Sequence, residues 1–159
     1  KMLKNLEKGF TKDDVKRVSS LCAEAGLPAA HYLILGGPGE TEETLQEAFD
    51  FMDELDPRAV IATIGVRIYP NTGLQLQAVA DGVISKDTDL LSSHFYISSL
   101  MGEEKLLKMI DDHAHARSNW VVTALGIRGS EDAMALLRKA GHRGPLWDML
   151  GKGARLRAR

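Results

Sequence analysis

Two nearly continuous apolar segments, residues 29–35 and 59–69, constrain the fold of this chain more than any other feature. Apolar runs of this length, rich in aliphatic residues, are typical of strands that are buried on both faces of a parallel sheet. A turn containing glycine and proline follows each segment, and helical patterns then begin, at residues 41–55 and 74–81. The order strand, turn, helix predicts an α/β fold in which neighbouring strands run parallel.

Helical periodicity predicts most of the remaining elements. We expect a helix over residues 11–26, because Thr11 and Asp14 have the spacing of a capping box and apolar residues then recur on one face. Two more helices are expected farther along the chain, over residues 103–125 and 130–140. The second half of the chain is therefore predicted to be mainly helical.

The predicted strands lie close together in the sequence, and they are too few for a self-sufficient sheet. Each of two paired strands would leave one edge without hydrogen-bond partners. We therefore expect this part of the chain to belong to a larger sheet or barrel, or to form a homo-oligomer through its strand edges. The predicted organisation is an α/β part, a helical C-terminal extension and a basic tail, at residues 1–82, 83–150 and 151–159.

Composition excludes several classes of site. The 159 residues include one cysteine, Cys22, which rules out an intramolecular disulfide and any zinc or iron–sulfur site that needs several cysteines of this chain. A lone thiol fits a reducing cytoplasm, and no apolar run is long enough for a membrane span. The net charge of -2 argues against binding to nucleic acid by bulk charge. We expect a cytoplasmic protein with no metal site of its own and with neither a membrane nor nucleic acid as partner.

A glycine-rich turn, Gly-Gly-Pro-Gly-Glu-Thr at residues 36–41, joins the first strand to a helix. Parallel α/β folds bind ligands at this kind of junction, where glycine lets a ligand approach the backbone. The turn matches neither the Walker phosphate loop nor the Gly-x-Gly-x-x-Gly dinucleotide pattern. Two interpretations stay open, a ligand-binding turn and a tight structural turn.

Arg67 is unusual because it lies within the second apolar segment. A buried arginine must be paired, and acidic residues near the neighbouring turn are the expected partners. A structural ion pair is one interpretation. The other is that Arg67 lines a ligand pocket at the carboxyl end of its strand.

Titratable groups are also concentrated at residues 111–117. His113 and His115 lie about 200° apart around a helix, so they cannot chelate one ion, and we expect a solvated face here. His31 lies on a buried-type strand and is interpreted as a core histidine whose hydrogen bonds are satisfied.

The two strand-to-helix junctions resemble those of the radical S-adenosylmethionine (SAM) superfamily, and best the group that often carries a cobalamin-binding domain. In that group the end of the fifth barrel strand often reads Gly-x-Pro-Gly-Glu-Thr, and residues 36–41 match it. The segment Arg-Ile-Tyr-Pro-Asn-Thr-Gly-Leu at residues 67–74 resembles the end of the sixth strand, which commonly reads Pro-Gly-Thr-Pro-Leu or close to it. The longer pattern Gly-x-Ile-x-Gly-x-x-Glu is only partly met, because Leu33 replaces its first glycine.

The resemblance implies a partial (β/α)6 barrel of the TIM type, of which this chain would supply the last two strands and their helices. In such enzymes a Cys-x3-Cys-x2-Cys loop holds a [4Fe–4S] cluster, which cleaves SAM to a radical that abstracts a substrate hydrogen. By resemblance, Leu35 packs on the adenine and the Gly36–Gly37 backbone lets the nucleoside approach. The full set of implied cofactor-binding residues is Leu35, Gly36, Gly37, Glu40, Val66, Arg67 and Ile68.

The chain departs from the family pattern, because the cluster cysteines, the first strands of the barrel and a cobalamin-binding motif are absent from it. We therefore expect it to be the C-terminal part of a radical SAM methyltransferase or oxidoreductase that is inactive alone. The complete enzyme would bind SAM and the cluster, and in one version of this expectation also cobalamin. This chain would bind none of them without the N-terminal half of the barrel. No catalytic residue and no substrate are identified.

Two alternatives of other classes stay open. The chain could be a non-catalytic interaction or regulatory module that self-associates through its strand edges. It could also be a small nucleotide-binding domain that uses the glycine turn directly.

Overall fold

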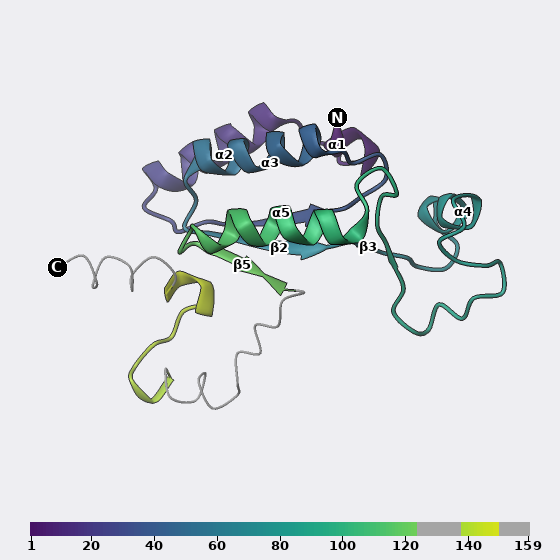
Figure 1. Cartoon of the computed structure of the whole chain (residues 1–159). Coiled ribbons are helices and arrows are strands. Elements are labelled where there is room, and N and C mark those ends of the chain that lie inside the picture. Colours follow the sequence, from purple (N-terminus) through teal and green to yellow (C-terminus); the bar gives the residue numbers. More distant parts are fainter. Residues whose placement is uncertain (124–137, 150–159) are drawn as a thin grey trace.

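The computed structural model describes residues 1–123 and 138–149. The structure is α/β, with a parallel sheet flanked by helices (Figure 1), and the partial barrel stays a prediction. The elements, in chain order, are α1 (Met2–Asn5), α2 (Lys12–Glu24), β1 (Ala30–Leu35), α3 (Glu42–Leu55), β2 (Ala59–Ile64), β3 (Val66–Arg67), α4 (Gly73–Ala80), β4 (Phe95–Tyr96), α5 (Glu103–His115), β5 (Trp120–Val122) and the 3₁₀ helix η2 (Leu146–Met149). Most of the helix predicted at 130–140, and the whole basic tail at 151–159, lie outside the described residues.

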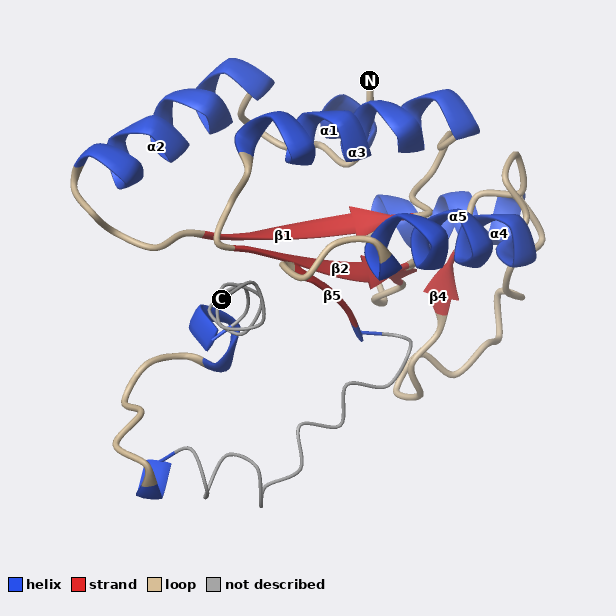
Figure 2. Ribbon diagram, turned by 60° about the vertical axis from the view of Figure 1, so that its left-hand side comes forward, coloured by secondary structure: helices blue, strands red, loops and turns tan. Residues whose placement is uncertain are grey.

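The main sheet has the strand order β1-β2-β5, and all its strands run parallel (Figure 2). In the register Ala30 lies opposite Ala59, and Val60 opposite Trp120. The expectation of only two sheet strands is therefore wrong, because β5 pairs with the edge of β2 that does not pair with β1. Since β5 comes from the predicted helical extension, both halves of the chain contribute to one sheet.

The helix predicted over 103–125 is wrong beyond His115. Helix α5 ends there, and the short link that follows enters β5. Asn119 fixes this link, because its side-chain amide donates to the Pro57 carbonyl at 3.0 Å and its own carbonyl accepts from the Val60 N–H at 2.8 Å. Aromatic and β-branched residues at 120–122 suit a strand, so pairing with β2 decides the conformation.

Helices α3 and α5 cover one face of the main sheet. Each threonine at the start of α2 and α3, Thr11 and Thr41, forms the capping box that the sequence pattern favours. The shared core consists of Leu35, Leu45, Phe49, Phe51, Met52, Val60, Ala62, Met101, Leu106, Ile110, Trp120 and Val122. The opposite face carries Tyr32, which is 72% exposed.

Pairing of copies of the chain through the edges of the sheet stays a prediction, and light scattering from the purified chain tests it.

The strand predicted over 59–69 is broken at Gly65, whose φ of 77° turns the chain away from the main sheet. Beyond this break β3 pairs antiparallel with β4 in a short ribbon. A second, smaller core lies against the ribbon and consists of Ile68, Ala78, Leu90 and Tyr96. Within the described parts of the chain, no helix combines the length and apolarity needed to cross a membrane.

Candidate functional site

The glycine turn lies at the carboxyl end of β1, where the sequence places it. The Leu35 carbonyl accepts a hydrogen bond from the Gly65 N–H at 2.7 Å, so the ends of β1 and β2 meet. The Gly36 carbonyl accepts from the Ser98 N–H at 2.9 Å, which ties the segment after β4 to the same turn. The structure therefore brings the glycine turn next to Gly65, where β2 ends, and next to Ser98 after β4.

The side chain of Glu40 is buried within the glycine turn and bonds to its backbone. Its carboxylate accepts a hydrogen bond from the Gly36 N–H, and only 1% of the residue is exposed. Burial raises the pKa of the Glu40 carboxyl, and hydrogen bonds from the Gly36 and Gly37 N–H groups oppose this in part. The Glu40 carbonyl also accepts from the Ser98 hydroxyl at 3.0 Å. These contacts direct the Glu40 carboxylate into its own turn.

Side chains of this chain cover the backbone of the glycine turn. A Cβ atom at Gly36, where φ is 87°, would lie 2.7 Å from Cδ2 of Leu106. A Cβ atom at Gly37 would lie 3.0 Å from Cδ2 of Leu6 on the loop after α1. The amide of Asn5 donates to the Pro38 carbonyl at 2.9 Å, which holds α1 over the turn. Packing within the chain is thus enough to require these glycines.

The remaining predicted site residues are placed in different environments. Leu35 is 1% exposed and belongs to the main core, whereas Ile68 is 0% exposed and belongs to the smaller core. Val66 lies near the turn, with its Cγ2 atom 3.5 Å from the position of a Cβ at Gly37. Among the predicted set, Val66 and Arg67 are partly exposed, and the others are buried.

Arg67 has no ion pair with any residue in the described ranges, so the structural pair that one interpretation requires is not formed there. Its guanidinium carbon lies 4.9 Å from the centre of the Tyr69 ring. Its Nε atom is buried and has no hydrogen-bond partner among the residues that the structure describes. The second interpretation, a ligand contact, stays a prediction.

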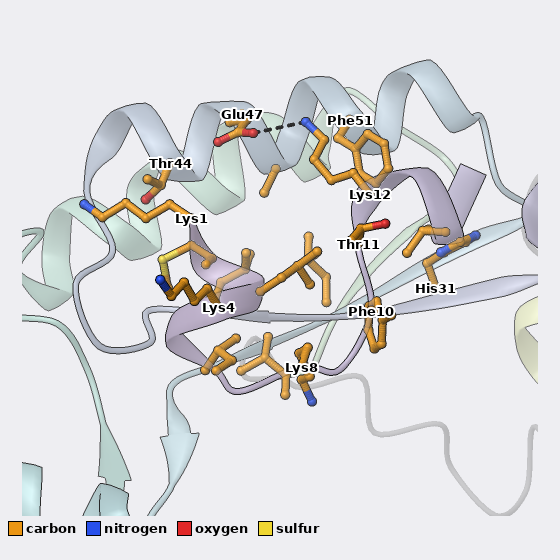
Figure 3. Close-up of a pocket in the computed structure, with 18 of the residues that line it drawn as sticks. Lys1, Lys4, Lys8, Phe10, Thr11, Lys12, His31, Thr44, Glu47 and Phe51 are labelled. Carbon is orange, nitrogen blue, oxygen red and sulfur yellow. Dashed lines mark hydrogen bonds and ion pairs between the residues drawn. The ribbon is translucent and has the colours of Figure 1, made fainter. Parts of the chain in front are cut away.

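A groove of about 990 Å³ lies between α1, β1 and α3 (Figure 3). Apolar side chains form much of its wall, and Lys1, Lys4, Lys8 and Lys12 contribute to its lining. The ammonium of Lys12 bonds to Glu47 at 3.1 Å and lies 4.6 Å from the centre of the Phe51 ring. The lysines recur three or four residues apart, which is the one local signal for this groove in the sequence.

His31 borders the groove as a partly buried histidine with a partner. One of its ring nitrogens lies 3.2 Å from the Ser19 hydroxyl, and burial lowers its pKa. The interpretation of His31 as a core histidine with satisfied hydrogen bonds agrees with this contact. Within the part of the chain that the structure describes, no group of three or more His, Cys, Asp or Glu residues could hold a metal ion.

A polar cluster between α3 and α5 has no counterpart among the sequence-based expectations. Arg117 makes two hydrogen bonds to the Asp53 carboxylate, at 2.7 and 2.5 Å, and a third to the His113 carbonyl at 2.8 Å. The His113 ring stacks on Phe49 at 4.0 Å between centres, and its side chain is 9% exposed. The expectation of a solvated face at 111–117 is therefore wrong for His113, because the contacts come from α3, which is distant in sequence.

Protonation of His113 should destabilise the fold. Burial lowers the pKa of His113, and nearby Arg117 lowers it further, while Asp53 and Asp50 oppose both effects. The folded chain then binds fewer protons than the unfolded chain, so we expect the free energy of unfolding to fall as the pH drops below about 6.5. Urea unfolding between pH 7.5 and 5 measures this loss.

The variant H113F keeps an aromatic ring on Phe49 and should remove this contribution to the pH dependence. The matched control is H115F, which changes an exposed histidine of the same helix and should keep the wild-type dependence. Equal pH dependence in H113F and wild type would contradict the assignment.

The chain has partial similarity to an enzyme of known activity. Over 72 residues it is 36% identical to the tryptophan 2-C-methyltransferase of Streptomyces laurentii, a match that covers 44% of this chain and 12% of that enzyme. No model of a protein family matches the chain. No solved structure matches it. The partial similarity fits a relationship to radical SAM enzymes, as the motif at residues 36–41 also indicates.

Proposed function

We propose that this chain is the C-terminal part of a radical SAM enzyme, with a methyltransferase as the favoured reaction type. One observation supports this most: the Gly-Gly-Pro-Gly-Glu-Thr motif at residues 36–41 joins a parallel strand to a helix, the position that the motif has in the superfamily. The similarity to a tryptophan methyltransferase adds support from a second source. In this proposal β1 and β2 are late strands of a partial (β/α)6 barrel.

The residues of this chain do not by themselves fit SAM or the cluster. Leu6 and Leu106 cover the glycine backbone, and the Glu40 carboxylate is turned into its own loop. A [4Fe–4S] cluster bound through Cys-x3-Cys-x2-Cys needs three cysteines, whereas Cys22 is the only one here. The proposed role of the chain is therefore to complete the barrel and to shape its carboxyl end, with the cofactor-binding residues supplied from outside it.

The proposed partner is the N-terminal part of the same barrel, packed along β1. Two features indicate that the partner packs along β1. Strand β1 pairs within the described residues with β2 alone, and the groove of about 990 Å³ follows its side chains from His31 to Leu35. An additional strand along β1 would pair with backbone groups on that edge.

The experiment uses the full coding region in which this sequence occurs. We expect an in-frame upstream segment that encodes Cys-x3-Cys-x2-Cys. The full protein, reconstituted anaerobically with iron and sulfide, should release 5′-deoxyadenosine from SAM, as measured by mass spectrometry. A reconstituted protein that binds a cluster but releases no 5′-deoxyadenosine would contradict the proposal, and so would a natural start codon at Met2.

Binding experiments on the isolated chain distinguish this proposal from the alternative of a small nucleotide-binding domain. Calorimetry with SAM and with ATP should show no binding to the 159-residue chain. Saturable binding of ATP, lost when the glycine turn is altered, would instead favour the alternative domain.

A further inference from the structure

We propose that the outer face of the β3–β4 ribbon binds an aromatic carboxylic acid, with Arg67 as the anion-binding residue. This inference rests on the proposed function and deepens it, because it names a substrate class for the same end of the sheet.

The strand register places three chemically complementary side chains on one face of the ribbon. Val66 lies opposite Tyr96 and Arg67 opposite Phe95, and side chains alternate between faces along a strand. Tyr96 is buried in the smaller core, so its face of the ribbon is covered. Arg67, Phe95 and, by the same alternation, Tyr69 belong to the other face. Phe95 is 50% exposed and Tyr69 is 52% exposed, so both rings are accessible there.

Arg67 has hydrogen-bonding capacity that the described part of the chain does not use. Its Nε atom is buried without an acceptor, and no carboxylate in the described ranges lies within ion-pair distance of its guanidinium. A guanidinium presents planar, paired N–H donors that match both oxygens of a carboxylate. A carboxylate bound to the terminal N–H groups of the guanidinium would give this cation the ion pair that it lacks within the described ranges.

The face is held rigidly before any ligand binds. The Ile68 N–H donates to the His94 carbonyl at 2.9 Å, which extends the pairing of the ribbon beyond Arg67. The Tyr69 carbonyl accepts from the Thr72 hydroxyl at 2.7 Å, and Thr72 also caps α4. The Tyr69 ring in turn lies against the Arg67 guanidinium. A site with fixed geometry loses little conformational entropy on binding.

The combination of groups selects the ligand class. A simple anion would use Arg67 but would leave the exposed faces of Tyr69 and Phe95 without contact. A planar ring bearing a carboxylate can stack on these aromatic side chains while its oxygens bond to the guanidinium. Substrates of this class would lie on the β3–β4 ribbon, beyond the break at Gly65 that ends β2.

The test measures binding of 3-phenylpropionic acid to the 159-residue chain by calorimetry, with 3-phenylpropanamide and acetate as comparison ligands. The acid should bind about ten to a hundred times more tightly than the amide, because hydrogen bonds to a charged group are among the stronger ones. Acetate should bind more weakly than the acid, since it lacks the ring. Equal affinity for the acid and the amide, or for the acid and acetate, would overturn the proposal.

Variants then assign the site. R67Q should lose the preference for the acid over the amide, and F95L should weaken both ligands. The matched control is R17Q, since the Arg17 side chain is 72% exposed on α2 and its replacement should leave binding unchanged. Circular dichroism verifies folding, and R67K provides a second variant that keeps the charge but loses the paired donors. An unchanged preference in folded R67Q or R67K overturns the assignment. Because no SAM or cluster is used, this result and the cleavage assay can fail independently.

Discussion

Replacing Gly36 with alanine is expected to lower the free energy of unfolding by about 2–4 kcal/mol, from backbone strain and overpacking together. Gly36 has a φ of 87°, which side-chain-bearing residues rarely adopt. The new Cβ would also lie 2.7 Å from Cδ2 of Leu106, a side chain that is fully buried and has little room to move. Urea denaturation, followed by far-UV circular dichroism, measures the change.

The matched control for this prediction is Gly73→Ala. Gly73 begins α4, has no positive φ and has no atom within 4 Å of the position that a Cβ would take, so alanine should be neutral or slightly stabilising. In a Leu106→Ala background the steric part of the Gly36→Ala effect should disappear, leaving the strain. If Gly36→Ala unfolds at the wild-type urea concentration, the turn is looser than the contacts with Leu106 and Glu40 indicate.

Local signals in the sequence are sufficient for several elements. Helices α2 and α3 begin one residue after Thr11 and Thr41, because each cap and the apolar stripe behind it lie within a few residues. The apolar run before Gly36 is likewise a parallel strand, β1, but its predicted burial on both faces is wrong, because only Leu35 is buried and Tyr32 is 72% exposed. These features depend on neighbours in sequence, so no knowledge of the tertiary structure is needed to find them.

Strand β5 depends on contacts that the sequence pattern does not contain. Val121 fits the spacing of the preceding helix, which is why the pattern predicts a single helix over 103–125. Pairing with Ile61 on β2 and the hydrogen bonds of Asn119 select a strand instead. The polar residues Ser118 and Asn119, before Trp120, are the local signal that the helix ends. This signal alone does not predict a strand, because the strand forms only by pairing with β2.

In the candidate site, too, some features follow from neighbouring residues and others depend on segments that are distant in sequence. The motif places Gly36 and Gly37 correctly at a strand end, because a glycine turn between a strand and a helix is a local feature. What covers them, Leu6 from the loop after α1 and Leu106 from α5, comes from segments distant in sequence. The sequence favours acidic partners for Arg67, but the break at Gly65 moves it from the main sheet to the outer face of a ribbon.

Glu40→Ala is expected to destabilise the chain by about 2–4 kcal/mol, because it leaves the buried Gly36 N–H without an acceptor and removes a packed side chain. Glu40→Gln should behave differently. The glutamine amide keeps an oxygen that can accept the Gly36 hydrogen bond, and it is uncharged. Since Glu40 is 1% exposed, removing the charge also removes the cost of burying it. At pH 7.5 the Gln variant should therefore equal or exceed the wild type in urea unfolding.

The pH dependence separates the charge of Glu40 from its hydrogen bond. Burial raises the pKa of Glu40 in the folded chain, so the folded state binds its proton more tightly than the unfolded state. The Glu40 contribution to stability should therefore decrease as the pH rises from about 4.5 through the raised pKa. The difference in free energy of unfolding between wild type and Glu40→Gln isolates this contribution, because all other titrating groups are shared. A difference that stays constant between pH 4.5 and 8, or a Gln variant as unstable as Glu40→Ala, would show that the carboxylate is stabilised in the turn by more than the Gly36 and Gly37 N–H groups.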